Sequence, residues 1–192
     1  MEIKKPSNKL KRFWEFLKKD TWQSWFVSIV LLFILIKLIL FPLVSFLTGS
    51  PLPLVVVESC SMYHESPFEE WFSKNSAFYE ERNITYSDFK SFSNKNGLNK
   101  GDIILVVKKA EYNMGDIIIF DARARYPIIH RVISQNPLGT KGDHNSEQIT
   151  IEKEISEGSV LGKAQVRIPF IGWLKLIFFD FAKPAEQRGL CR

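Results

Sequence analysis

The sequence predicts a mainly β domain behind a single transmembrane helix, with a short helical insertion near the start of the domain. Three observations predict this organisation. One apolar segment of membrane length lies near the N-terminus, short runs rich in Val and Ile follow it between Gly-Asp turns, and a polar, aromatic stretch interrupts those runs. At 192 residues, 45% of them hydrophobic, the chain has room for one such domain and its appendages.

The apolar segment, residues 25–47, reads WFVSIVLLFILIKLILFPLVSFL and carries a single charge, Lys37. About 23 residues are enough to cross a hydrocarbon core of about 30 Å as a helix. A cleavable signal peptide is the alternative, but its apolar stretch is usually only about 7–15 residues long. The segment therefore predicts a transmembrane helix, and Pro42 is a candidate position for a kink.

The net charge of +5 is unevenly distributed, because residues 1–24 are rich in lysine. Basic residues beside a transmembrane helix stay on the cytoplasmic side, so residues 1–24 are expected to be cytoplasmic and the remainder of the chain extracytoplasmic. We therefore expect a single-pass protein of the cell membrane, with the lipid bilayer as one partner. Basic residues interleaved with aromatics on a recognisable fold are not found, so nucleic acid is not an expected partner.

The extracytoplasmic domain is expected over residues 48–182, followed by a C-terminal tail over residues 183–192. Runs rich in Val and Ile, bounded by Gly, Asp and Pro, predict its strands. The predicted strands are Pro53–Ser59, Asp102–Lys108, Asp116–Asp121, Ile128–Gln135, Gly139–Lys141 and Ser159–Ile168.

The helical insertion is expected over about residues 64–98, as two short helices. Phe68, Trp71 and Phe72 recur at helical spacing, which predicts a small aromatic core beneath the insertion. Ser66 before a proline, with Glu69 three residues later, predicts a capping box at the start of the first helix.

The two cysteines, Cys60 and Cys191, lie far apart and have no metal-ligand spacing, so neither a disulfide framework nor a zinc site is predicted. Cys60 is an alternative nucleophile, although a lone cysteine is most often a small buried hydrophobe.

Three residues beside predicted strands have the chemistry of a serine hydrolase. Ser61 stands in VVVESCSM, His130 in PIIHRV and Asp143 in TKGDHN. A serine hydroxyl needs an imidazole to take its proton, and the imidazole needs a third group to fix its tautomer. The other histidines, His64 and His144, are alternative bases, but His130 lies on a strand that would aim its side chain rigidly.

These motifs, together with GDIIIFDARARYPIIHRVI and the late RIPFIGWLKL, resemble the membrane-bound signal peptidase I family, specifically its archaeal and endoplasmic-reticulum branch. The resemblance covers most of residues 53–178 and implies a signal-peptidase-like β catalytic domain. The bacterial branch has lysine where this chain has His130. The chain departs from the usual Ser-Gly-Ser-Met-x-Pro pattern at Cys60 and His64, and Ile149 stands where eukaryotic relatives have a second aspartate.

The resemblance implies a membrane-anchored serine endopeptidase that removes signal peptides from secretory preproteins. Ser61 would be the nucleophile, His130 the general base and Asp143 the acid that orients the imidazole, with Glu147 a weak substitute for it. The oxyanion hole would consist of the Ser61 backbone N–H and the Ser59 hydroxyl. The substrate would lie extended along the strand that leads into Ser61, near the side chains of Val55, Val57 and Ile129.

Two other functions remain open at this stage. One is a related membrane peptidase that processes a narrower set of precursors. The other is a catalytically inactive, membrane-anchored β domain that binds preproteins or a translocon partner. Accessory subunits are possible partners for each function. No cofactor and no metal are expected, because a serine, histidine and carboxylate triad needs neither.

Overall fold

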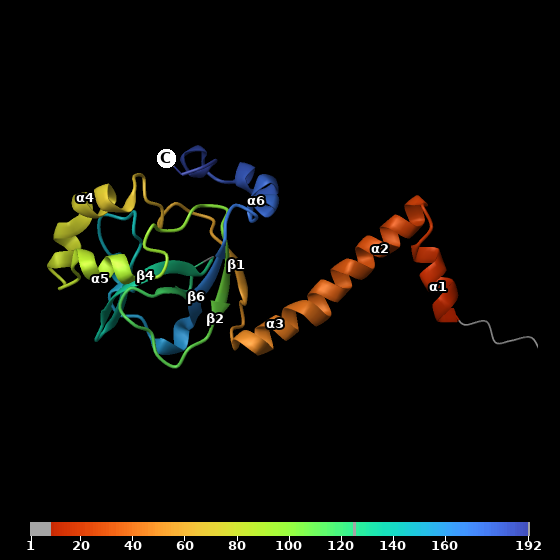
Figure 1. Cartoon of the computed structure of the whole chain (residues 1–192), viewed down its shortest axis with the longest axis horizontal. Helices are drawn as coiled ribbons and strands as arrows, with labels where there is room; N and C mark the ends of the chain where they lie inside the picture. Colours follow the sequence, from red (N-terminus) through yellow and green to blue (C-terminus); the bar gives the residue numbers. More distant parts are fainter. Residues whose placement is uncertain (1–8, 125, 192) are drawn as a thin grey trace, which may run out of the picture. The chain divides into compact units, whose positions relative to one another are not determined.

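The computed structural model describes residues 9–124 and 126–191 (Figure 1). The chain forms two compact units, and the break between them falls between Leu47 and Thr48. The first eight residues of the predicted basic segment lie outside the described residues.

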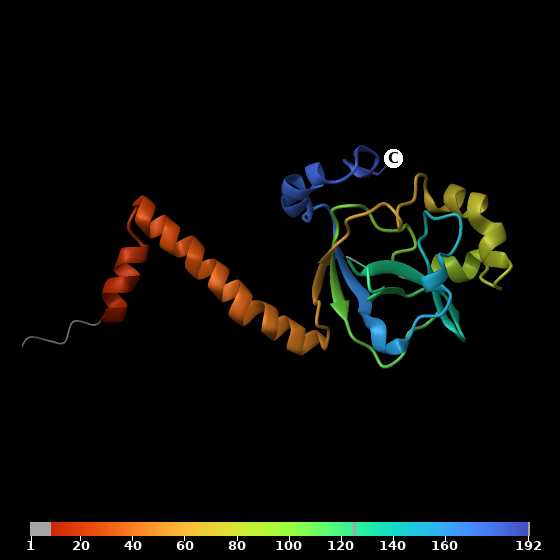
Figure 2. The same ribbon diagram turned by 180° about the vertical axis from the view of Figure 1, so that it is seen from behind.

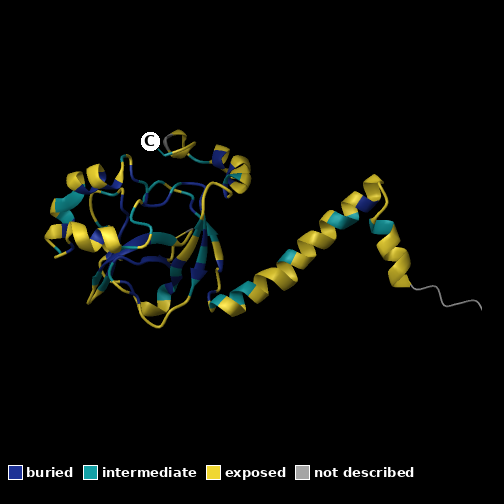
Figure 3. Cartoon of the chain, in the orientation of Figure 1, coloured by how far each residue is buried: buried dark blue, intermediate teal, exposed yellow. Residues whose placement is uncertain are grey.

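The first unit is helical, as the sequence predicts for residues 25–47. Helix α1 (Lys9–Leu17) is followed by one continuous helix over residues 22–48, which consists of α2 (Trp22–Leu35), the π-helical turn η1 (Ile36–Leu40) and α3 (Phe41–Thr48). The helix over residues 22–48 is long and apolar enough to cross a membrane. Its apolar side chains are largely exposed (Figure 3), as expected for a helix that is not covered by protein.

The π-helical turn lies directly before Pro42, where a kink was a candidate. Proline has no N–H to donate to the preceding turn of a helix. The Phe41 N–H hydrogen-bonds to Ile36 O, five residues back, whereas an α-helix bonds to the residue four back. The helix is therefore locally wider at this point.

The second unit is built on a six-stranded antiparallel sheet with the order β1-β2-β6-β3-β4-β5. All six predicted strands are present, with ends that differ by a few residues at most. Edge strands β1 and β5 are short, and β6 is the longest. The strands are β1 (Leu54–Val56), β2 (Ile103–Val107), β3 (Ile117–Phe120), β4 (Ile128–Gln135), β5 (Leu138–Lys141) and β6 (Val160–Ile168).

The expected β-sheet is present, but the chain as described is not mainly β. About 40% of the described residues are helical and 18% are in strands. The apolar N-terminal helix and the insertion contribute many helical residues, whereas the six strands are only three to nine residues long.

The predicted insertion forms α4 (Phe68–Glu80) and α5 (Tyr86–Ser91), which lie together beside β4 (Figures 1 and 2). The predicted aromatic core is confirmed. Seven buried side chains form one cluster that joins the two helices to the sheet: Phe68, Trp71, Phe72, Tyr79, Ile84, Phe89 and Ile133.

The predicted capping box at Ser66 is wrong. Pro67 is the N-cap of α4, and the Ser66 hydroxyl is buried without a hydrogen-bond partner among the described residues. A capping box is found instead at the start of α5, where the Thr85 Oγ1 accepts from the Asp88 N–H and the Asp88 carboxylate accepts from the Thr85 N–H.

The expectation of no disulfide is also wrong, because Cys60 and Cys191 are bonded to each other. Their Cα atoms lie 5.6 Å apart although 131 residues separate them in the sequence. After β6, helix α6 (Trp173–Phe179) and the two 3-10 turns η4 (Asp180–Ala182) and η5 (Ala185–Gln187) bring the C-terminus back to the chain that follows β1. Cys60 therefore has no free thiol and is not a candidate nucleophile.

Candidate active site

His130 lies near the start of β4 and is paired in register with Ile118 of β3, which buries its side chain. Its Nδ1 atom is hydrogen-bonded to Oε1 of Glu152, which is also completely buried. An ionised carboxylate only accepts hydrogen bonds, so in a pair with a neutral imidazole the proton lies on Nδ1 and Nε2 has a free lone pair. This is the tautomer that a general base requires.

Glu152 ends the 3-10 turn η2 (Thr150–Glu152), which packs against β5. Its Oε2 accepts from the Ile149 N–H at 3.0 Å, and its Oε1 accepts from the Thr140 hydroxyl at 3.2 Å. The Gln148 side-chain amide donates to the backbone oxygens of Thr140 and Glu152, at 2.9 and 3.3 Å. The carboxylate beside His130 is therefore rigidly held.

The Nε2 atom of His130 faces Gly142 at the end of β5. A Cβ atom on Gly142 would lie 2.8 Å from His130 Nε2 and 2.7 Å from the Ser61 backbone oxygen. Only glycine fits at this position, and its lack of a side chain brings the histidine close to the backbone of Ser61. The His144 N–H donates to the same Ser61 oxygen at 2.9 Å and fixes that backbone in place.

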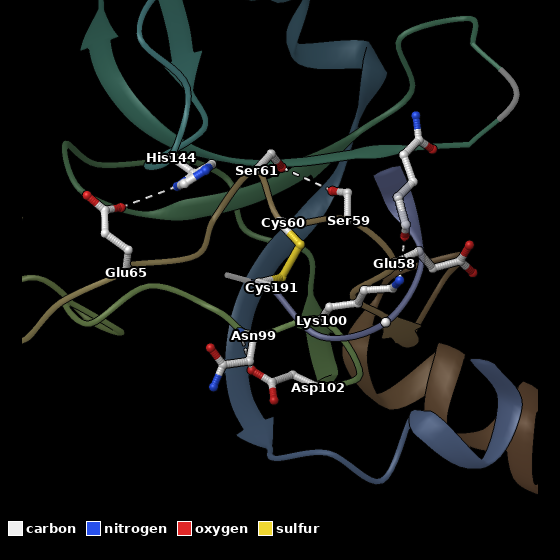
Figure 4. Close-up of a disulfide and its surroundings, with 12 residues drawn as sticks. Glu58, Ser59, Cys60, Ser61, Glu65, Asn99, Lys100, Asp102, His144 and Cys191 are labelled. Carbon is white, nitrogen blue, oxygen red and sulfur yellow. Dashed lines mark hydrogen bonds and ion pairs between the residues drawn. A yellow bond between two sulfur atoms is a disulfide. The ribbon is translucent and has the colours of Figure 1, made fainter. Parts of the chain in front are cut away.

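The Ser61 hydroxyl lies 3.2 Å from the Ser59 hydroxyl, and the two serines share a hydrogen bond (Figure 4). Ser59 is exposed and Ser61 is partly exposed, so solvent reaches both. Within the described residues, no hydrogen bond joins Ser61 Oγ to His130. A catalytic hydrogen bond is often long or absent before substrate binds, and rotation about the Ser61 Cα–Cβ bond is enough to redirect its hydroxyl.

Asp143 does not orient His130, which corrects the sequence-based prediction. Its carboxylate is bound by Arg131, with Arg131 Nε 2.9 Å from Oδ1 and Nη2 2.7 Å from Oδ2, and His64 Nε2 lies 3.0 Å from Oδ2. Burial raises the pKa of Asp143, but the Arg131 charge and the hydrogen bonds from His64 and Arg131 outweigh it and lower the pKa to about 2.

The Arg131–Asp143 pair joins the site to the helical insertion. The guanidinium also donates to the backbone oxygens of Ser93 and Asn94, directly after α5, and to Gly115 O. Asp143 follows Gly142 in the chain, so the pair fixes the loop that separates His130 from Ser61. Asp143 therefore acts as a positioning residue in this structure.

Neither of the other two histidines replaces His130. His64 is buried and stacked on Trp71, with ring centroids 3.6 Å apart, and its Nε2 is engaged by Asp143. His144 is more exposed and lies with its Nδ1 3.5 Å from a carboxylate oxygen of Glu65 (Figure 4). Glu147, the weak substitute for Asp143, is exposed.

Lys141 is a buried cation that the sequence did not single out. Its Nζ donates to Gly142 O at 3.1 Å and lies 4.9 Å from the ring centre of Phe78. Burial lowers the pKa of Lys141 to about 8, although the Asp143 and Glu152 carboxylates oppose this shift. Its neutral form is therefore accessible just above neutral pH.

The three expected substrate contacts differ in their exposure. Val57 is only 3% exposed and belongs to the core of the sheet, so it is not a substrate contact. Val55 and Ile129 pack against the same core cluster but are only partly buried. Val55 and Val57 share a face because they are two residues apart in an extended chain, and that face is directed into the core.

A pocket elsewhere on the second unit includes neither Ser61 nor His130, and it is lined by residues 120–123, 151, 154–156, 158 and 159. In the described part of the chain, no cluster of three or more His, Cys, Asp or Glu residues is arranged to hold a metal ion.

The arrangement contains the groups that acyl transfer requires, which are a hydroxyl, a histidine and a buried carboxylate. The sequence motifs predict Ser61 and His130 as site residues, but they do not indicate Glu152 as the partner of His130. The only local signal for Glu152 is its place three residues after the N-cap of a turn, from which its carboxylate accepts from the N-cap N–H of Ile149.

No family model matches the chain, and no curated protein matches it significantly.

Proposed function

We propose that this protein is a membrane-anchored serine endopeptidase of the signal peptidase I type, which removes signal peptides from secreted preproteins. The observation that carries the proposal is the hydrogen bond between His130 Nδ1 and Glu152, which directs Nε2 towards the backbone of Ser61 and favours the tautomer that a general base requires. The motifs around Ser61 and His130 that resemble this family support the choice of substrate class.

In the proposed reaction, the Ser61 hydroxyl attacks the scissile carbonyl carbon while His130 Nε2 takes its proton. The tetrahedral intermediate collapses with cleavage of the peptide bond, and His130 gives the proton to the departing amine. Water then releases the acyl group from Ser61 by the same two proton transfers. The Glu152 carboxylate accepts the hydrogen bond from Nδ1 and stabilises the imidazolium.

The oxyanion would accept hydrogen bonds from the Ser61 N–H and the Ser59 hydroxyl. The 3.2 Å between the two serine oxygens supports this role, because it brings the Ser59 hydroxyl beside the reacting atom. A preorganised donor of this kind contributes about 3–4 kcal/mol to transition-state stabilisation.

Two features of the chain support an action at a membrane. The helix over residues 22–48 is able to span a bilayer, and α6 exposes large apolar side chains, among them Leu174, Ile177 and Phe178. Exposed apolar residues on a short helix favour the membrane interface. We propose a single-pass topology with the N-terminus cytoplasmic, in which the anchor raises the local concentration of membrane-bound preproteins.

The proposal is tested by cleavage of a model preprotein with the full-length protein in detergent. We expect the parent to cut at one site after the signal peptide, and Ser61→Ala and His130→Ala each to abolish cleavage. His144→Ala is the matched control and should retain activity. Equal activity of Ser61→Ala and the parent would refute the serine mechanism.

One observation favours a second candidate, an inactive domain that binds preproteins. The Ser61 hydroxyl is hydrogen-bonded to Ser59 and, within the described residues, not to His130. The same experiment separates the two functions, because a binding domain would retain the preprotein on the full-length protein and cut it at no site.

A further inference from the structure

The C-terminal strap, which we define as the segment from Asp180 to Cys191, is fixed at both ends. Asp180 Oδ1 lies 2.7 Å from the Nζ of Lys100, which is itself buried. Cys191 is disulfide-bonded to Cys60 (Figure 4). The strap is therefore covalently attached to the residue that precedes Ser61.

Lys183 lies between these two anchors and points at the chain that leads into the candidate nucleophile. Its Nζ donates to the backbone oxygen of Glu58 at 2.9 Å and lies 3.6 Å from the Glu58 carboxylate. Lys175 of α6 also contacts this carboxylate, at 2.8 Å, but does not reach the backbone oxygen. The Glu58 carbonyl is thus occupied by one lysine only.

This carbonyl lies two residues beyond the end of β1, which is an edge strand of the sheet. The Val57 N–H donates to Asp102 O, and the Gly101 N–H donates to Val57 O, so Val57 faces β2. Backbone groups alternate between the two sides of an extended chain, and continuing this alternation from β1 and Val57 directs those of Glu58 away from β2. Since β1 is an edge strand, an added peptide strand would need the acceptor that Lys183 occupies.

Between its two ends, the strap is held by Lys183 and by a hydrogen bond from the buried Lys100 Nζ to Gln187 O, at 2.7 Å. Between its two ends, the side chains with a described exposure are exposed, apart from that of Lys183. Exposed polar contacts contribute little stability. The disulfide, by contrast, keeps Lys183 at a high effective concentration next to Glu58.

We propose that the C-terminal strap competes with an extended peptide for the Glu58 carbonyl, and that the Cys60–Cys191 disulfide holds the strap in the competing position. A dithiol would release it by supplying two electrons and two protons, which yields two protein thiols and oxidises the dithiol to a disulfide. The choice of an extended peptide as the competitor rests on the proposed function.

The test measures binding rather than cleavage. Full-length protein with Ser61→Ala, in detergent, is titrated into a fluorescent peptide that carries an uncharged signal-peptide cleavage region, and anisotropy gives the affinity. We expect Lys183→Met to tighten binding by about 2- to 10-fold, the contribution of one additional backbone hydrogen bond. Cys191→Ser, and reduction by a dithiol, should tighten it to a similar extent.

Lys175→Met is the matched control, because it removes a charge from the same glutamate without freeing the carbonyl, and it should not tighten binding. Equal affinity for all variants would overturn the inference, while cleavage by the parent would still stand. If Lys183→Met tightened peptide binding but the parent protein, with Ser61 intact, cut no preprotein, the competition by the strap would be supported and the peptidase function would be refuted. Absence of peptide binding in every variant would overturn both.

Discussion

The carboxylate of Glu152 is hydrogen-bonded to Nδ1 of His130, and both side chains are buried in the second unit. Twenty-two residues separate them in the chain, and each is fixed by a different element, β4 and the turn η2. A carboxylate buried without partners would be unfavourable, and this one is hydrogen-bonded to His130 Nδ1, the Thr140 hydroxyl and the Ile149 N–H. In the proposed mechanism, it holds the imidazole in the tautomer that accepts a proton at Nε2.

We predict that Glu152→Gln lowers kcat by about 10³- to 10⁴-fold with little change in KM. An amide in place of the carboxylate no longer favours the tautomer with a proton on Nδ1, and it does not stabilise an imidazolium. Steady-state cleavage of a model preprotein by the full-length protein in detergent measures both constants. Glu154→Gln is the matched control, because Glu154 is two residues away and exposed. Retention of the parent kcat in Glu152→Gln would exclude Glu152 from the mechanism.

Asp143→Asn should act mainly on stability, in contrast to Glu152→Gln. It leaves the buried Arg131 without its counter-charge, which typically costs about 3–5 kcal/mol of unfolding free energy. Urea unfolding at pH 7, followed by near-ultraviolet circular dichroism of the stacked Trp71, measures this loss. Glu147→Gln, an exposed carboxylate in the same loop, should leave the transition unchanged.

The pH dependence of the unfolding free energy of Asp143→Asn gives an independent check on the Arg131–Asp143 charge pair. The folded-state pKa of Asp143 is about 2 and its ordinary value is 3.8, so its stabilising contribution is complete above about pH 4 and is lost as the pH falls through 2. This contribution amounts to about 2 kcal/mol. The difference in stability between the parent and Asp143→Asn should therefore shrink between pH 4 and pH 2. A constant difference would contradict the proposed charge pair.

The contrast between Glu152 and Asp143 also shows what the sequence could and could not predict. Local patterns predicted the strands, because runs of Val and Ile between Gly-Asp turns have few other stable conformations. They also placed His130 on a strand and Ser61 after one. The partner of His130 depends on which of several nearby glutamates is folded inward, and only Glu152 among Glu147, Glu152, Glu154 and Glu157 is buried. No local pattern distinguishes it from the others.

The disulfide was missed for a similar reason. Pairing of Cys60 with Cys191 requires the chain after β6 to return to the chain after β1, across 131 residues. The spacing of two cysteines holds no information about such a return. The aromatic cluster of the insertion was predicted correctly, because its spacing follows the period of a single helix.

Lys141→Met is predicted to stabilise the protein by about 1–3 kcal/mol at pH 7, because a buried charge is replaced by an apolar side chain of similar length. The pKa of Lys141 is about 8 in the folded protein and 10.5 ordinarily, so the unfolded state binds more protons between these values. Parent stability should gain from this group as the pH rises from 8 to 10.5, and the advantage of the variant should diminish. Urea unfolding of both proteins at pH 7 and pH 10 tests this, with the exposed Lys153→Met as the control. A variant less stable than the parent at pH 7 would mean that the contacts of Lys141 outweigh its desolvation.

Ser59→Ala is predicted to lower kcat by about 10²- to 10³-fold, the usual effect of removing one oxyanion donor, while KM changes little. The Ser59 hydroxyl lies 3.2 Å from Ser61 Oγ and is exposed, so its loss should not affect folding. Ser59→Thr keeps the hydroxyl and is the matched control, which should retain most of the parent kcat. If the two variants were equally impaired in preprotein cleavage, the cause would be the shape of the side chain at this position, and the hydroxyl of Ser59 would have no part in stabilising the oxyanion.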